Sequence, residues 1–451
     1  MISGALRVLL SLTLIVLITH QLFAQEKKEI FLTLNRAVML GLKNNEAVLR
    51  SKIDVNRAKG QVKEALSEAL PKINFKSSFT RNWALPVFTF GGQQFKAGTD
   101  NVINFGVDLS QTIYRGGQVG AGLKMARYYQ QISETNSEQM QVDIVLMIHN
   151  SYYDVLLTEA IVEVSEAAYK RAITQYEGVK RFFEAGTVSD YDVLRAKVEV
   201  TNAKVAVNQA KNRVSMSKAN LKQIIGLPQS ILLRCITTLE VDSSSIPKNI
   251  STAVRNAMSS RSDLKAAKLE TAMNEASIRL ARGKRGADIS LSAGYIMQAQ
   301  INDPKFKSLA VRDFSRSWNT LLNVSFPIFD GRRNMGQVLQ AEAEFEKSRY
   351  NEKQLEKQIE VDVTMAMLNI FEASERVDAS AEAIKLANRG VGMVQLQYES
   401  GLSTQLELID AQLTLKQAET DRVTAQYDYV KAAAMLKNLL GQLGADQDVE
   451  K

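Results

Sequence analysis

The sequence predicts a mainly helical protein with a small β part, built from two copies of one helix-strand-strand-long helix-helix unit. Three glycines of the first half recur in the second half at a constant offset of 215 residues. They pair as Gly116 with Gly331, Gly186 with Gly401, and Gly226 with Gly441. Long stretches without proline and short runs of alternating polarity stand at matching places in both halves. A repeat of this length indicates a duplicated domain rather than a solenoid of small units.

The N-terminus has the pattern of a secretory signal peptide, which we assign to residues 1–24. Arg7 precedes an apolar run at residues 8–18, and Ala24 ends a plausible cleavage site. The alternative is an uncleaved membrane anchor, but the run is short for a spanning helix, which needs roughly 20 residues. We therefore expect an exported protein without a transmembrane helix, for which a β-barrel is the remaining way to span a bilayer.

Residues 33–70 are predicted to form the first helix, because apolar residues recur there at spacings of three and four. Pro71 is expected to end it. The first repeat is assigned to residues 25–228, a linker to 229–247, the second repeat to 248–441 and a C-terminal tail to 442–451.

Four runs of alternating apolar and polar residues predict strands of about ten residues. They lie at about 72–82, 102–113, 288–297 and 318–328. A half-buried soluble sheet would alternate in the same way, but this length also suits a tilted strand that crosses a bilayer. Each pair of strands is joined by a loop of roughly twenty residues, and Trp83 and Trp318 flank the strands as interfacial aromatic residues would.

Two very long helices are predicted, each followed by a turn and a shorter helix. The long helices are about 117–184 and 332–400, the turns 185–188 and 400–403, and the shorter helices 188–225 and 404–440. Each long helix would reach roughly 100 Å, and the shorter helix would return along half of it. Such helices pair as coiled coils. For the first short helix we expect a seam of Val188, Val193, Leu194, Val198 and Val205.

The composition excludes several kinds of function. One cysteine, Cys235, and two histidines allow neither an internal disulfide nor a Cys/His metal cluster. No basic run interleaves with aromatics, so nucleic-acid binding is not expected. No phosphate-binding loop and no nucleophile–base set are present, so we expect neither a cofactor nor an enzyme.

The strand count predicts an oligomer. Four strands cannot close a barrel, and an open edge in lipid leaves unpaired backbone groups. A dimer would give eight strands, whose interior is filled by side chains, whereas a trimer would give twelve with room for a water-filled bore. Sequence alone does not choose between them.

The chain resembles the TolC-like outer-membrane efflux proteins over nearly its whole mature length. The resemblance rests on ordered, duplicated segments: 32–38, 69–73, 110–117 and 325–331, and the two turns at 186–194 and 401–410. It implies a homotrimer with a twelve-stranded outer-membrane β-barrel continuous with a long periplasmic α-helical barrel. The implied function is that of an exit duct for efflux or type I secretion. The implied partners are a periplasmic adaptor, an inner-membrane transporter and outer-membrane lipid.

The resemblance also assigns roles at the turns. Gly186, Thr187, Gly401 and Leu402 match the periplasmic tip that meets the adaptor, although a plain helix-capping turn would have the same residues. A structural or adhesive coiled-coil protein of the envelope, without transport activity, remains the alternative reading of the whole chain.

Four further residues match the gate of the family. Asp192 and Tyr398 match residues that link the closed tip, and Ser403 stands where the family has an arginine. Glu407 and Asp410 match the acidic positions of the constriction. They lie three apart and therefore on one helix face. Two solvated helix charges would look the same in the sequence.

Overall fold

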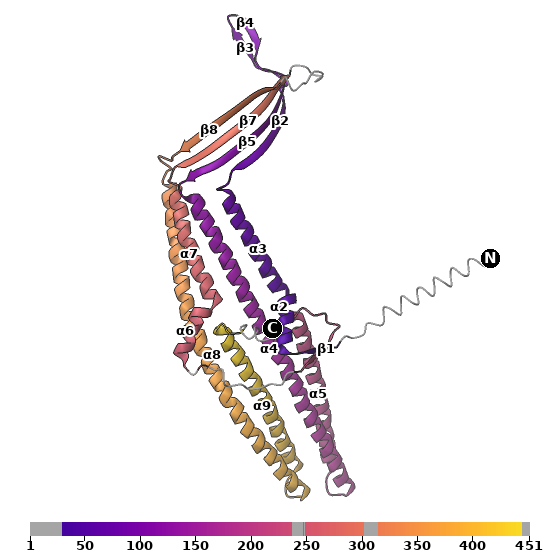
Figure 1. Cartoon of the computed structure of the whole chain (residues 1–451). Coiled ribbons are helices and arrows are strands. Elements are labelled where there is room, and N and C mark those ends of the chain that lie inside the picture. Colours follow the sequence, from indigo (N-terminus) through magenta and orange to yellow (C-terminus); the bar gives the residue numbers. More distant parts are fainter. Residues whose placement is uncertain (1–28, 237–246, 248, 302–313, 444–451) are drawn as a thin grey trace, which may run out of the picture. The chain divides into compact units, whose positions relative to one another are not determined.

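A computed structural model describes residues 29–236, 247, 249–301 and 314–443 (Figure 1). The predicted signal peptide lies outside these residues, as do parts of the linker and of the tail. The chain forms two compact units. Unit 1 comprises Met1–Arg50, Glu138–Arg261 and Lys357–Lys451, and unit 2 comprises Ser51–Ser137 and Ser262–Glu356.

The helices repeat at the offset of the glycines or within one residue of it. The first repeat has four helices: α2 (Leu34–Asn44), α3 (Glu46–Ser67), α4 (Gln118–Glu184) and α5 (Asp190–Ile224). Their counterparts in the second repeat are, in the same order, α6 (Ile250–Ser260), α7 (Ser262–Gly283), α8 (Arg333–Glu399) and α9 (Gln405–Leu439). The pairs α2/α6 and α3/α7 form the first set, and the pairs α4/α8 and α5/α9 form the second. The first set differs by 216 residues and the second by 215. The duplicated, mainly helical fold is therefore confirmed. No helix in the described part of the chain is long and apolar enough to cross a membrane.

The single helix expected at residues 33–70 is wrong, because the chain breaks it at Asn45 into α2 and α3. Asn45 has an extended backbone, and its side-chain oxygen accepts from the amide of Ala47 at 2.8 Å, as an N-cap does. Its side-chain amide donates to the carbonyl of Ile224 at 2.9 Å, 179 residues away. The break thus ties the start of the repeat to the end of α5.

Unit 2 contains a four-stranded antiparallel sheet in the order β2-β5-β7-β8. Its strands are β2 (Lys72–Arg81), β5 (Asn101–Arg115), β7 (Asp288–Ile301) and β8 (Ser315–Ser325). The two central strands are longer than the expected ten residues, and β8 ends before Pro327, which has no amide to donate to a ladder.

One face of this sheet is apolar and exposed. Phe75, Val107, Tyr295 and Trp318 stand opposite one another across the four strands. Trp318 lies inside β8 rather than beside it, and 81% of it is exposed. A wide exposed apolar face indicates a surface that contacts a membrane or another protein.

The first strand loop is partly ordered, which the sequence did not predict. The strands β3 (Val87–Phe90) and β4 (Gln93–Lys96) form a hairpin at the end of the sheet away from the helices (Figure 1). Gly91 and Gly92 form its turn with positive φ angles of 58° and 81°.

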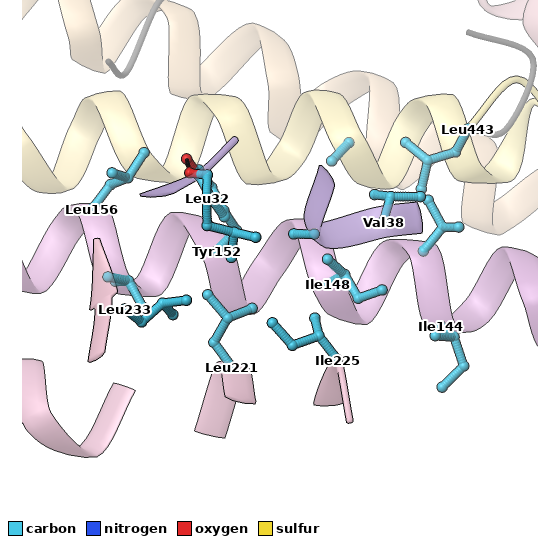
Figure 2. Close-up of a cluster of buried hydrophobic side chains, with 14 of the residues drawn as sticks. Leu32, Val38, Ile144, Ile148, Tyr152, Leu156, Leu221, Ile225, Leu233 and Leu443 are labelled. Atoms are coloured by element: carbon cyan, nitrogen blue, oxygen red, sulfur yellow. Dashed lines mark hydrogen bonds between the residues drawn. The ribbon is translucent and has the colours of Figure 1, made fainter. Parts of the chain in front are cut away.

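The main hydrophobic core belongs to unit 1 (Figure 2). Ile148 and Tyr152 of α4 pack there with Leu221 of α5 and Leu32. The buried Tyr152 hydroxyl donates to the carbonyl of Leu32 at 2.9 Å.

Leu32 ends the strand β1 (Glu29–Leu32), which pairs in parallel with β6 (Leu232–Cys235). The strand β6 lies in the stretch that the sequence predicts to be a linker, so part of that stretch belongs to the folded unit. Burial raises the pKa of the Cys235 thiol to about 12, so it stays protonated and unreactive.

Within the single chain, the residues predicted as the seam of α5 are not its most buried line, although Val188 and Val193 are half-buried. Leu194, Val198 and Val205 are half exposed or more, whereas Ala196, Ala203 and Ala210 are buried at a seven-residue spacing. Small side chains allow the helix axes to approach closely, so alanine rather than valine forms the contact line within the chain.

Candidate functional site

The two helix turns of unit 1 share one backbone geometry. Gly186 and Gly401 each have a φ of +76°, which a residue with a side chain rarely adopts. The amide of Thr187 donates to Phe182 O at 2.9 Å, and that of Leu402 to Gln397 O at 2.8 Å, which closes a Schellman motif after each long helix. Both turns are exposed, and Leu402 is 82% exposed.

A capping box starts the helix after each turn. In the first, the Ser189 amide donates to Asp192 Oδ2 at 3.0 Å, and the Asp192 amide donates to Ser189 Oγ at 3.3 Å. In the second, the Thr404 amide donates to Glu407 Oε2 at 2.8 Å. Asp192, matched to the gate, and Glu407, matched to the constriction, therefore also stabilise a helix start.

Ser403 acts on Glu407 rather than on a neighbouring hairpin. Its hydroxyl donates to Glu407 Oε2. This hydrogen bond, followed by that of the Thr404 amide, holds the pKa of the Glu407 carboxyl below its ordinary value of 4.5. Glu407 and Asp410 are both exposed, so at neutral pH the start of α9 presents a carboxylate that no nearby cation neutralises in the described structure.

The two hairpin tips touch within unit 1. Gln405, which is buried, donates from Nε2 to the backbone oxygen of Asp192 at 3.1 Å. The rings of Phe182 and Tyr398 meet edge to face with centroids 6.0 Å apart. Both contacts join a residue of the first hairpin to one of the second, so the tips are held side by side.

The matched gate residues come near each other without pairing directly. Burial, and then the charge of Asp192, raise the pKa of Tyr398. The Tyr398 hydroxyl is nevertheless buried without a hydrogen-bond partner among the described residues, and Asp192 Oδ2 accepts from Ser189 instead. A small shift of either helix could therefore form a hydrogen bond from the Tyr398 hydroxyl to the Asp192 carboxylate.

Sequence reasoning missed an ion pair with two hydrogen bonds between the hairpins. Arg171 of α4 holds Glu419 of α9 with two hydrogen bonds, Nη1 to Oε1 at 3.1 Å and Nη2 to Oε2 at 2.8 Å. The residues are 248 positions apart, and nothing in the local sequence of either one indicates a partner. Gln405 and Phe182 were missed for the same reason.

The described residues contain no group of three or more His, Cys, Asp and Glu side chains that could hold a metal ion. Glu407 and Asp410 are two carboxylates from one chain. A polyvalent cation would need further ligands beside them.

Comparison with known proteins places the chain in a family. The sequence model of the outer membrane efflux protein family matches twice, at residues 39–227 and 253–442, once for each repeat. The chain therefore belongs to the outer membrane efflux protein family. It is a protein of the outer membrane that serves efflux through a channel.

Individual relatives agree with this membership. The chain is 21% identical to the outer membrane protein TolC of Salmonella enteritidis over 90% of its own length and 81% of that protein. It is 22% identical to the outer membrane efflux protein BepC of Brucella suis, covering 92% and 86%. The solved structure of the Campylobacter jejuni CmeC outer membrane channel has the same fold, with a TM-score of 0.80, 18% identity and coverage of 91% and 85%. None of these supports the adhesive coiled-coil alternative.

Proposed function

We propose that three copies of the chain close one twelve-stranded barrel in the outer membrane and continue it as a helical duct into the periplasm. The four-stranded sheet ends in β2 and β8, and these edges would carry unpaired backbone groups at a cost of several kcal/mol each in lipid. The exposed apolar face suits contact with lipid. Three sheets give room for an aqueous bore, which two would not.

The hairpin tips are proposed as the periplasmic end of this duct. Gly186, Thr187, Gly401 and Leu402 would contact an adaptor, and their exposure supports this role. The contact between Gln405 and Asp192 is the single observation that best supports a gate here, because it joins the two hairpins beside both candidate gate residues.

The gate would close without the family arginine. In this proposal Gln405 and the packing of Phe182 on Tyr398 hold the hairpins together, while Asp192 and Tyr398 form their link only after a small shift. Glu407 and Asp410 would form two stacked rings of three carboxylates at the constriction and favour cations. Energy would come from an inner-membrane transporter, and the duct itself would be passive rather than catalytic.

Recording from the purified trimer in planar bilayers tests the duct. Wild-type protein should show a small conductance that polyvalent cations block, and Glu407→Ala/Asp410→Ala should conduct more and lose the block. Glu399→Ala, which removes an exposed carboxylate before the turn, is the matched control and should keep the block. If neither wild type nor the double variant forms a large pore, the duct is ruled out.

A second experiment tests the tip. Gly401→Pro should impair export while leaving the trimer intact, because proline cannot adopt a φ of +76°. Normal export together with unchanged adaptor crosslinking would remove the tip assignment.

A further inference from the structure

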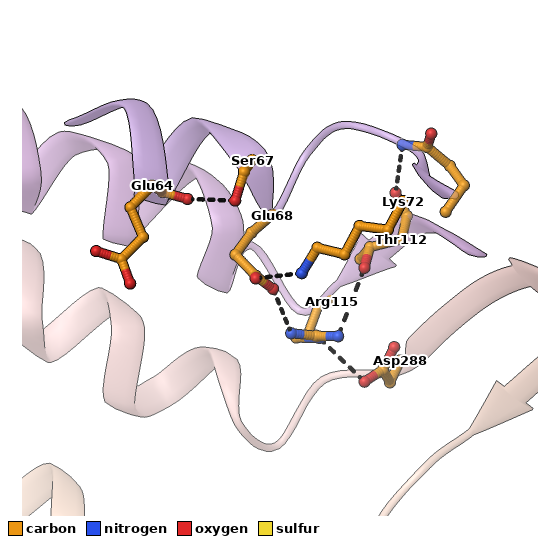
Figure 3. Close-up of polar contacts among 8 residues, drawn as sticks. Glu64, Ser67, Glu68, Lys72, Thr112, Arg115 and Asp288 are labelled. Atoms are coloured by element: carbon orange, nitrogen blue, oxygen red, sulfur yellow. Dashed lines mark hydrogen bonds and ion pairs between the residues drawn. The ribbon is translucent and has the colours of Figure 1, made fainter. Parts of the chain in front are cut away.

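The junctions between sheet and helices in unit 2 differ in charge between the two repeats. At the first junction the charges neutralise one another (Figure 3). Lys72 Nζ lies 2.5 Å from Glu68 Oε1, and Arg115 contacts Glu68 Oε2 at 3.4 Å and Asp288 Oδ2 at 3.2 Å. No charge of this network is left over for another molecule.

The second junction gathers four exposed basic residues. Lys284 and Arg285 follow α7, Arg332 immediately precedes α8, and Arg333 begins it. Asn334 Nδ2 donates to the carbonyl of Ala281 at 2.7 Å, which brings the two dibasic segments together.

The acidic residue beside this segment, Asp330, offsets only one of the four positive charges and forms no ion pair with them in the described structure. Asp330 Oδ2 accepts from the amide of Asn334 at 2.9 Å. Among the described residues, Arg285, Arg332 and Arg333 have no ion-pair partner. The second junction therefore has a local excess of positive charge, unlike the first.

Arg332 is also held in a strained conformation. Its φ is +67°, and no other residue with a side chain has a positive φ in the described part of the chain. Its counterpart in the first repeat is Gly117, with a φ of +76°. The fold therefore accepts glycine here, and an arginine kept in an unfavourable conformation points to a role outside folding.

Exposed apolar residues precede this basic segment. Phe326, Ile328 and Phe329 are 63%, 94% and 85% exposed. They follow β8 directly, at the end of the sheet where the helices begin. Apolar side chains followed by arginines form the usual pattern of a segment at a membrane boundary, with the apolar part in the acyl region and the cations at the headgroups.

We propose that this basic junction (Lys284, Arg285, Arg332, Arg333 and the three apolar residues) binds the phosphate headgroups of anionic phospholipid in the periplasmic leaflet. The inference rests on the proposed function, which puts the junction at that boundary. Guanidinium groups bind phosphate oxygens bidentately, and the apolar residues would contact the acyl chains. A second copy of the chain is the competing occupant. Of the acids beside its β2, Glu68 is already paired to Lys72 and Arg115, and only the exposed Glu64 has no ion-pair partner among the described residues, which is too little to neutralise four basic residues.

Thermal unfolding of the full-length trimer in nanodiscs tests the proposal. The probe is phosphatidylglycerol mixed into phosphatidylcholine, and the wild-type Tm should rise with its fraction. Arg285→Gln/Arg333→Gln should have a near wild-type Tm in phosphatidylcholine but should not show this rise. Its apparent affinity for phosphatidylglycerol in neutral detergent should fall roughly tenfold for each arginine replaced. Arg389→Gln, an exposed arginine of the same helix, should behave as wild type.

The variant Arg332→Gly distinguishes lipid binding from a purely structural role of Arg332. Relief of strain should raise its Tm in phosphatidylcholine above wild type, while the gain from phosphatidylglycerol shrinks. Soluble glycerol phosphate should stabilise neither protein, which separates a lipid from a free phosphate.

An undiminished gain from phosphatidylglycerol in Arg285→Gln/Arg333→Gln would overturn the proposal. Dissociation of that variant into monomers in neutral detergent would instead identify a second copy as the occupant. Conductance is recorded on the same samples. A wild-type protein that gains stability from the lipid but forms no pore would refute the duct and leave the lipid contact standing.

Discussion

Removing Arg171 should loosen the contact between the two hairpins of unit 1 and favour the open tip. Its two hydrogen bonds to Glu419 join α4 to α9. The side chains are 26% and 21% exposed, so the pair is screened less than a surface ion pair but is not fully buried. If the tip opens by separation of the hairpins, Arg171→Ala removes a link that exists only in the closed state.

The size of the effect follows from the geometry. A hydrogen bond to a charged group contributes about 1.5–3 kcal/mol, and partial exposure reduces this to about 1–2 kcal/mol for the pair. Because 1.4 kcal/mol is a factor of ten, the opening equilibrium of each protomer should rise roughly 5- to 30-fold.

Single-channel recording measures this as the open fraction at fixed voltage. Lys211→Ala is the matched control, because Lys211 pairs with Glu166 at 2.8 Å within the first hairpin and should leave gating unchanged. The swap Arg171→Glu/Glu419→Arg should restore much of the closed state. An open fraction of Arg171→Ala within twofold of wild type, with no coupling to Glu419→Ala in a double-mutant cycle, would refute the reasoning.

Two further predictions concern the turn and the helix seam. The lowered pKa of Glu407 stabilises the fold above the ordinary value of 4.5, and this stabilisation is lost as pH falls through the lower pKa of the folded state. Ser403→Ala should therefore move the loss of cation block to higher pH, whereas Ser400→Ala, which removes a hydroxyl that donates to a carbonyl, should not. Equal pH midpoints for the loss of block in the two variants would contradict this. Ala203→Leu should lower the free energy of unfolding by about 1–3 kcal/mol, measured with denaturant, because it overfills a buried position. Val205→Leu, on the exposed face, should lower it by less than about 0.5 kcal/mol. A larger effect of Val205→Leu would support the valine seam instead.

Much of the fold could be predicted because its signals are local. Gly186 and Gly401 end the long helices, and Ser189 and Thr404 start the next ones, because a positive φ and a capping oxygen act within a few residues. The constant offset between the glycines was enough to predict the duplication of the fold. The acidic pair of α9 could be placed on one face from its spacing alone, although its role at a constriction stays a prediction.

The tertiary structure decided what depends on partners far along the chain. Asn45 breaks a periodic helix because Ile224 offers it a carbonyl, and β6 forms because β1 lies beside it. Arg171 and Glu419 could pair only after both hairpins were in place. Hydrophobic spacing cannot tell which of two faces another helix will cover, so the alanine seam also had to come from packing. The sequence determined the elements and their order through local backbone preferences. Long-range contacts decided how those elements meet, because their two partners never lie in one short segment of the sequence.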